Sequence, residues 1–189
     1  MPTTDSRRRY PKGAARRAEI LRAALDAYAA SDRQGPRLRD IAAAVGLTEA
    51  GVLHYFDSKD HLFVAILEAR DRAAAEQHDL NSEDGVWGYL EETMRTPGLT
   101  KLFLDMSAAA SDPGHPAHAF MARHDLAVRR LLRSALGTDD PWVERIVIAL
   151  AEGLQARWLR DPATDLVGDM RRFVAEVRAN RLAPGGTER

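Results

Sequence analysis

The chain has 189 residues, of which 45% are hydrophobic and 29% are charged, and its formal net charge is −1. This composition suits a buried core beneath a charged surface, and the lack of cysteine excludes disulfides and thiolate metal sites. The longest apolar run, Ile146 to Ala151, is far too short for a membrane span, and the N-terminus lacks the apolar stretch of a signal peptide, so we expect a cytoplasmic protein.

Positive charge is concentrated near the N-terminus. Residues 1–60 hold 11 Lys or Arg against 8 Asp or Glu, whereas residues 61–189 hold 16 against 20. Six of the basic residues lie close together: Arg7, Arg8, Arg9, Lys12, Arg16 and Arg17. Such a segment either contacts the phosphates of a nucleic acid or remains a solvated tail. We expect residues 1–12 to form a basic arm without fixed structure, which orders only on its partner.

Apolar residues at helical spacing predict an all-α fold of about nine helices, and no alternating strand pattern is present. The first helix is predicted from Arg16 to Ser31, with its apolar stripe at Ile20, Leu21, Ala24, Leu25 and Tyr28. Two short helices follow, at residues 38–45 and 49–55. Gly46 stands between them, as a turn with positive φ requires, and Thr48 stands where the second short helix needs an N-cap.

Two short helices joined by a glycine turn fit a helix-turn-helix. The ordered residues of this segment are Arg39-Asp40-Ile41-Ala42, Gly46-Leu47-Thr48 and His54-Tyr55-Phe56-Asp57-Ser58-Lys59. They resemble the DNA-binding signature of the TetR family of transcriptional regulators, over about a quarter of the chain. The alternative is an ordinary helical hairpin. Arg37, Gly51 and Leu53 depart from the family pattern, which usually has a Thr or Ser cap, a threonine and a tyrosine, so the DNA sequence that is read stays open.

The resemblance implies that residues 49–55 form a recognition helix in the major groove of a palindromic operator. The residues that would face base edges are Glu49, Ala50, Gly51 and His54. Those that would touch phosphates or position the helix are Arg39, Thr48, Tyr55 and Lys59. One short helix reads too few bases for tight binding, which is an independent reason to expect a twofold dimer.

Further helices follow, divided by Gly and Pro. Ser58 is expected to cap a helix that runs toward His78, and Thr164 to cap the last one, which ends near Asn180. The helices between them are predicted at residues 85–94, 100–110, 116–136 and 141–160. We therefore expect four regions: an arm at 1–12, a helix-turn-helix DNA-binding domain at 13–58, an effector-binding and dimerisation domain at 59–182, and a loose tail at 183–189.

The helix at 141–160 carries two different stripes. The bulky stripe consists of Val143, Val147, Leu150, Leu154 and Trp158, and the flatter stripe of Ile146, Ala149, Gly153 and Ala156. The resemblance implies that the last two helices pair with their copies across a twofold axis. The candidate dimer residues are therefore Ile146, Ala149, Gly153, Ala156, Phe173 and Val177. The alternative is that both stripes pack within one chain.

Large side chains in the predicted body could line a small-molecule site, as the resemblance implies. The candidates are Phe63, Leu67, Trp87, Met94, Phe103, Met106, Phe120 and Trp158, with His124, Gln155 and Asp105 as polar anchors. Each of them taken alone is more often plain core.

No glycine-rich phosphate loop or nucleophile motif is present, so we expect neither an enzyme nor a cofactor. His115, His118 and His124 lack an acidic third ligand at a suitable spacing, so we expect no metal site. The prediction is a homodimeric DNA-binding regulator, by its resemblance a repressor, released from a palindromic operator by a largely apolar effector. A small helical enzyme and a ligand-independent DNA-binding protein are the alternatives.

Overall fold

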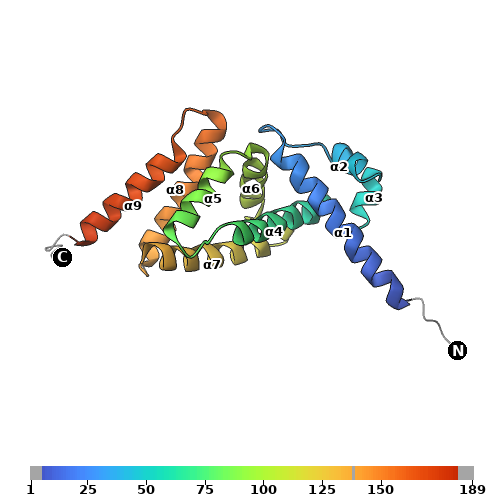
Figure 1. The fold of residues 1–189 in the computed structure, drawn as a ribbon, viewed down its shortest axis with the longest axis horizontal. Coiled ribbons are helices and arrows are strands. Elements are labelled where there is room, and N and C mark those ends of the chain that lie inside the picture. Colours follow the sequence, from blue (N-terminus) through green and yellow to red (C-terminus); the bar gives the residue numbers. More distant parts are fainter. Residues whose placement is uncertain (1–5, 138, 183–189) are drawn as a thin grey trace. The chain divides into compact units, whose positions relative to one another are not determined.

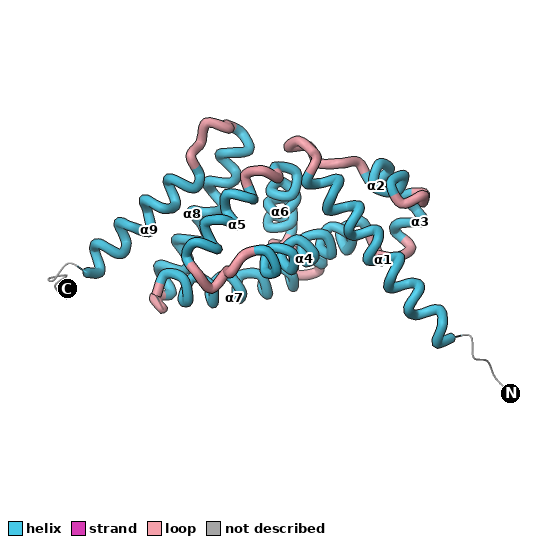
Figure 2. The backbone as a smooth tube through the Cα atoms, viewed as in Figure 1, coloured by secondary structure: helices cyan, strands magenta, loops and turns pink. Residues whose placement is uncertain are grey.

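The computed structural model describes residues 6–137 and 139–182, which contain nine α-helices and no strand. Figure 1 shows the helices, and Figure 2 shows that short loops connect them. In chain order they are α1 (Ser6–Ala29), α2 (Leu38–Ala44), α3 (Glu49–Leu53), α4 (Lys59–Gln77), α5 (Glu83–Thr93), α6 (Pro97–Ala109), α7 (Pro116–Leu136), α8 (Pro141–Arg160) and α9 (Leu166–Leu182). The predicted all-α class and helix number are confirmed for this part of the chain.

The chain divides into two compact units. The first comprises Met1–Gln77 and Glu92–His124, and the second comprises His78–Glu91 and Asp125–Arg189. The predicted domain boundary at residue 58 remains a prediction.

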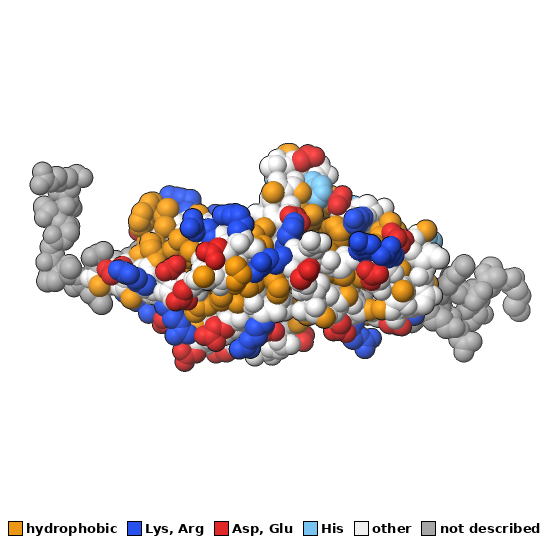
Figure 3. All heavy atoms as spheres, turned by 90° about the horizontal axis from the view of Figure 1, so that it is seen from above, with side chains coloured by type: hydrophobic (Ala, Val, Ile, Leu, Met, Phe, Trp, Pro, Cys, Tyr) orange, Lys and Arg blue, Asp and Glu red, His pale blue; other side chains and the backbone are white. Residues whose placement is uncertain are grey.

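Acidic and basic side chains are interspersed over the face drawn in Figure 3. Within the described residues, no helix combines the length and the apolar character needed to cross a bilayer.

Helix α1 begins at Ser6, well before the predicted start at Arg16. The expected lack of fixed structure is therefore wrong for residues 6–12, whose backbone is helical, while residues 1–5 lie outside the described residues. Arginine is a good helix former, and extending an existing helix costs much less than starting a new one. The packed half of α1 provides that start, because Ile20, Ala24 and Tyr28 are buried against α2, α4 and α6.

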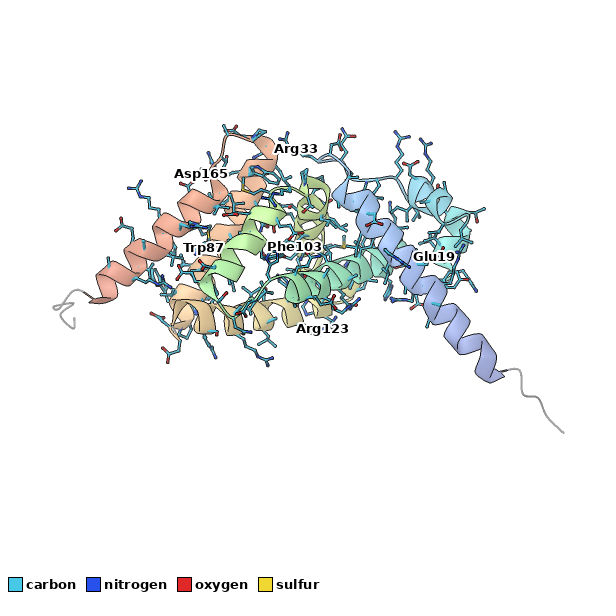
Figure 4. All side chains as sticks on the ribbon, in the orientation of Figure 1. Glu19, Arg33, Trp87, Phe103, Arg123 and Asp165 are labelled. Atoms are coloured by element: carbon cyan, nitrogen blue, oxygen red, sulfur yellow. The ribbon has the colours of Figure 1, made fainter. Side chains whose placement is uncertain are left out.

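Other helix starts differ from their predictions as well, and α5 begins at Glu83 rather than at residue 85. Helix α6 begins at Pro97 rather than Thr100, because proline is well tolerated in a first turn, where its missing N–H has no partner to lose. Gly98 then packs against the end of α1, where a Cβ atom would collide with Ser31 Oγ and lie 2.9 Å from the Tyr28 carbonyl oxygen. The residue that caps α9 is Asp165 (labelled in Figure 4), which accepts a 2.9 Å hydrogen bond from the Gly168 N–H, and not Thr164.

Each unit has its own apolar core. In the first unit the core joins α1, α2, α3, α4, α6 and the start of α7, and its most deeply buried large side chains are Ile20, Ile41, Val52, Leu62, Ile66 and Leu67. In the second unit α8 packs on α9. The bulky stripe of α8 is buried as predicted at Val143, Val147, Leu154 and Trp158, whereas Leu150 is only half-buried.

A polar cluster interrupts the core of the first unit between α4, α6 and α7. His124 Nδ1 lies 2.9 Å from Asp71 Oδ2, and Arg70 donates to Asp71 Oδ1 at 2.7 Å. The Arg70 guanidinium lies 4.9 Å from the centre of the Phe103 ring, and the His124 ring lies 5.1 Å from it. Burial raises the pKa of Asp71, but the hydrogen bond from His124 and the charge of Arg70 outweigh it, so the pKa is lowered overall.

The lowered pKa of Asp71 predicts how the stability of the first unit depends on pH. A carboxyl group with a lowered pKa stabilises the fold above its ordinary value of about 3.9, and that contribution disappears as the pH falls through its folded value. Asp71→Asn should therefore lower the free energy of unfolding by about 1–3 kcal/mol at pH 7. In urea titrations, the difference from the wild type should shrink as the pH falls below the ordinary carboxyl value of about 3.9.

Asp105→Asn is the matched control, because the Asp105 side chain is 54% exposed and forms a 2.7 Å surface pair with Lys101. Surface pairs of this kind contribute little, so this variant should stay close to the wild type at every pH. An effect of Asp71→Asn that did not change with pH would contradict the electrostatic explanation.

Candidate nucleic-acid interface

The turn between α2 and α3 is closed by two backbone hydrogen bonds. Gly46 adopts a φ of 65°, its N–H donates to the Ala43 carbonyl oxygen at 3.0 Å, and the Leu47 N–H donates to Ala42 at 2.9 Å. This arrangement is a Schellman motif, in which one residue with positive φ reverses the chain and satisfies carbonyl groups at the end of a helix. The predicted positive φ at Gly46 is confirmed.

Helix α3 starts at a side-chain cap, as predicted. Thr48 Oγ1 accepts a 3.0 Å hydrogen bond from the Gly51 N–H. Gly51 lies close to this cap, because an added Cβ would stand 3.3 Å from Thr48 Oγ1 and 3.5 Å from Leu47 Cβ. Val52 and Phe56 are buried and hold the helix against the core. Arg37 stands at the N-cap position of α2 without a side-chain hydrogen bond, so α2 lacks the corresponding cap.

The eight candidate DNA-binding residues lie at the surface of α2, α3 and the start of α4. Six are exposed and two are half-buried: the exposed ones are Arg39, Thr48, Glu49, Ala50, His54 and Lys59, and the half-buried ones are Gly51 and Tyr55. Glu49 lies in the first turn of α3, where a negative charge is also favoured by the helix dipole. The Lys59 ammonium lies 5.3 Å from the centre of the Phe63 ring.

Ser58 caps α4 as predicted, accepting a 3.1 Å hydrogen bond from the His61 N–H through its Oγ. This cap fixes the start of α4. It thereby also fixes the backbone of Lys59, which follows soon after the predicted recognition helix at residues 49–55.

Two basic residues of α1 contact the helix-turn-helix itself. Arg16 donates to the Val45 carbonyl oxygen, at the end of α2, and pairs with Glu19 at 2.6 Å. The Arg17 guanidinium lies 4.6 Å from the centre of the Phe56 ring. These contacts were not predicted from the sequence, where both residues were counted among the N-terminal basic residues and placed at the start of the first helix.

An exposed stripe runs along α8 in the second unit. Ala149 and Gly153 are exposed, Ile146 and Ala156 are half-buried, and no atom lies within 4 Å of the place where a Cβ of Gly153 would stand. Trp142, four residues before Ile146, is 55% exposed and continues the same face. Trp142 was not predicted as part of this stripe, although its spacing from Ile146 was visible in the sequence. On α9, Phe173 and Val177 are half-buried.

The effector candidates are distributed over both units. The first unit holds Phe63, Leu67, Met94, Phe103, Met106, Phe120 and His124, and the second holds Trp87, Gln155 and Trp158. Leu67, Met106 and Phe120 are buried in the core. Phe103, which is labelled in Figure 4, lies in the polar cluster with His124. Trp87 donates to Glu83 at 3.1 Å, and its ring lies 5.2 Å from the Arg171 guanidinium.

Two polar anchors differ in what the structure offers them. The Gln155 Oε1 atom is buried and accepts no hydrogen bond from any described residue. A buried acceptor left without a donor costs about 1–3 kcal/mol, which keeps Gln155 among the candidate polar anchors. Asp105, in contrast, is exposed and pairs with Lys101, which makes it a poor anchor for a buried ligand.

The three histidines considered as metal ligands each contact a different group of the protein. His115 Nε2 lies 3.4 Å from Asp60, His118 Nδ1 lies 2.8 Å from the Ala110 carbonyl oxygen, and His124 contacts Asp71. Within the described part of the chain, no three His, Asp or Glu side chains are grouped so that they could hold a metal ion.

Known proteins resemble this chain over the helix-turn-helix and beyond it. The family model described as "Bacterial regulatory proteins, tetR family" matches residues 20–66. The transcriptional repressor AcnR of Corynebacterium diphtheriae is 27% identical over 180 residues, which cover 90% of this chain and 83% of AcnR. The regulator RutR of Escherichia coli is 40% identical over 53 residues, which cover 28% of this chain and 25% of RutR.

A solved structure of similar fold extends this likeness to the body. The TetR transcription regulator from Haloarcula marismortui superposes with a TM-score of 0.65 at 22% identity, over 88% of this chain and 98% of that one. Over residues 20–66 the chain thus matches the tetR family of bacterial regulatory proteins, and over most of its length it is similar to a transcriptional repressor, so these comparisons support a DNA-binding transcriptional regulator. The solved structure adds that the fold is shared.

Proposed function

We propose that the protein binds a palindromic operator as a twofold dimer, with α3 of each protomer in a major groove, and that a small effector releases it. The observation that carries the proposal is the exposed face of the α2–α4 segment. Its polar side chains point to solvent, while Val52 and Phe56 fix the same short helix from below. A recognition helix needs this combination of a free face and a rigid support.

The exposed residues divide into two roles by their chemistry. Glu49 can accept from a cytosine amine, and His54 can bond to base edges, so these two are the proposed base readers. Arg39, Thr48 and Lys59 are better suited to phosphates, which supply affinity without sequence preference. Ala50 and Gly51 leave room for the groove to approach α3 closely, and Tyr55 completes the surface beside His54, with the two rings 5.8 Å apart.

The proposed dimer forms through the exposed stripe of α8, together with Phe173 and Val177 of α9. Glycine inside a helix costs about 1 kcal/mol relative to alanine, yet among the described residues no atom beyond its own helix backbone and chain neighbours lies within 4 Å of a Cβ placed at Gly153. A close-packed neighbouring helix from a second copy would explain this glycine, and it would also cover Trp142. Two copies then present two recognition helices to two half-sites.

The proposed effector contacts lie among the aromatic and sulfur-containing residues of the body. Within the first unit, a largely apolar ligand would suit side chains such as Phe103. Within the second unit, taken by itself, a ligand group that donates a hydrogen bond would satisfy Gln155 Oε1. Binding can release DNA only if the effector prefers a conformation that no longer fits both half-sites. The coupling must then be reciprocal, so operator DNA weakens effector binding by the same factor.

The division between phosphate and base contacts can be tested with two substitutions. Lys59→Ala should weaken binding to operator and random duplexes alike, and it should lower the salt slope by roughly one unit, because one phosphate contact is lost. His54→Ala should instead change the preferred bases and leave the slope unchanged. Lys101→Ala, on α6, is the control for loss of positive charge alone. A changed base preference with an unchanged slope in Lys59→Ala would reverse the assignment.

The dimer interface can be tested with Gly153→Arg. A large charged side chain cannot be buried unpaired without a high cost, so this variant should be monomeric in light scattering while it keeps its helical circular dichroism. Ala175→Arg is the matched control, because Ala175 is exposed on α9 on the opposite side from Phe173 and Val177. A dimeric Gly153→Arg protein would place the interface elsewhere.

The effector contacts can be tested by screening apolar metabolites with hydrogen-bond donors through tryptophan fluorescence. A true effector should bind about 5- to 150-fold more weakly when operator is saturating. Phe103→Ala and Gln155→Ala should each be measured, since they probe the two units separately. A ligand whose affinity ignored the operator and both substitutions would not be the regulatory effector.

A further inference from the structure

Two neighbouring arginines of α1 contact the DNA-binding helices in different ways. Arg16 uses both ends of its guanidinium, with Nη1 donating to Glu19 and Nη2 donating to the Val45 carbonyl oxygen. Its side chain is 29% exposed. Arg17 is exposed and lies with its guanidinium over the ring of Phe56. Both belong to the same basic segment of the sequence, yet only Arg16 is bonded to the backbone of the helix-turn-helix.

The Val45 carbonyl needs a donor that the turn does not supply. The last carbonyl groups of a helix have no partner within it. In α2 the Schellman turn satisfies two of them, because Leu47 donates to Ala42 and Gly46 donates to Ala43. The Val45 carbonyl follows directly in the reversal, and the guanidinium of Arg16 reaches it from a helix 29 residues earlier in the sequence.

The contact also links α1 to the direction in which α3 leaves the turn. Val45 directly precedes Gly46. The orientation of its carbonyl group therefore depends on the same backbone dihedral angles that set the direction of α3. A guanidinium held at a second point by Glu19 has little freedom to move. Hydrogen bonds to charged groups are among the stronger ones in proteins, so the orientation of this peptide group is well fixed.

We propose that Arg16 is a positioning residue that fixes the turn and thereby the angle of the recognition helix, whereas Arg17 contacts phosphate. The proposal rests on the proposed DNA-binding function. Arg16 then acts on sequence discrimination, because a misaimed α3 loses base contacts and keeps its non-specific attraction. Arg17 acts on affinity for any duplex, because its guanidinium is exposed and can move from the Phe56 ring to a phosphate.

The test compares Arg16→Met with Arg17→Met, which remove the same charge at adjacent positions. The probes are a duplex selected by the wild-type protein from a random library and a scrambled duplex of equal length. Arg16→Met should lower the affinity for the selected duplex by roughly tenfold and leave the scrambled duplex and the salt slope unchanged. Arg17→Met should weaken both duplexes alike and lower the salt slope by roughly one unit.

A direct readout of the turn accompanies the binding measurements. Amide hydrogen exchange at Gly46 and Leu47 should be faster in Arg16→Met than in the wild type and unchanged in Arg17→Met. If Arg16→Met does not fold, Arg16→Lys retains the charge but offers one nitrogen instead of two, and it should show the same faster exchange at those two amides.

Two results would overturn the proposal. One is an Arg16→Met protein that loses affinity for both duplexes with a shallower salt slope, which would make Arg16 a phosphate contact. The other is unchanged exchange at Gly46 and Leu47 in the Arg16 variant that folds. Failure of the wild-type protein to select any duplex would instead overturn the proposed function, so the two failures are distinguishable.

Discussion

The reversal of the chain at Gly46 is the constraint on which the proposed DNA-binding surface depends. A side chain at a φ of 65° is strained by its Cβ, so glycine allows α2 to end and α3 to begin within four residues. The tight reversal places Val52 and Ile41 in one core while Glu49 and His54 face solvent. A longer or looser connection would leave the orientation of α3 undefined, because a helix of so few residues is not stable alone.

Short helices therefore depend on contacts with neighbouring residues. In the first unit, α3 is supported by contacts before it, at its start and after its end. Thr48 caps α3 at its start, Phe56 anchors the chain after its end, and Arg16 bonds to the turn that precedes it. Helix α1 is central to this support, because it packs against α2, α4 and α6. Gly98 allows α6 to reach the end of α1 at a distance that a larger residue would prevent. Helix α6 thus packs directly against α1, which itself packs against α2, the helix that precedes α3.

Local signals in the sequence explain which features could be predicted. The bounds of α7 and α8 follow from Pro116 and Pro141 at their starts, and the caps at Thr48 and Ser58 follow from side-chain chemistry. The start of α6 was misplaced because Pro97 and Gly98 are typical both of a loop and of a helix beginning beside another helix. The contacts of Arg16 with Val45 and of Asp71 with His124 join residues 29 and 53 positions apart, and no local pattern encodes them.

Three glycines differ in whether the structure of a single chain requires a glycine at their position. Gly46 is required by its dihedral angle, and Gly98 by the atoms of α1 that surround it. Gly153 satisfies neither condition, since it lies in the middle of α8 with open space around it. The exposed indole of Trp142 on the same face is equally without a reason inside the chain. A residue that weakens its own helix and an apolar side chain left in water would both be explained by the proposed dimer, in which a second copy packs against this face.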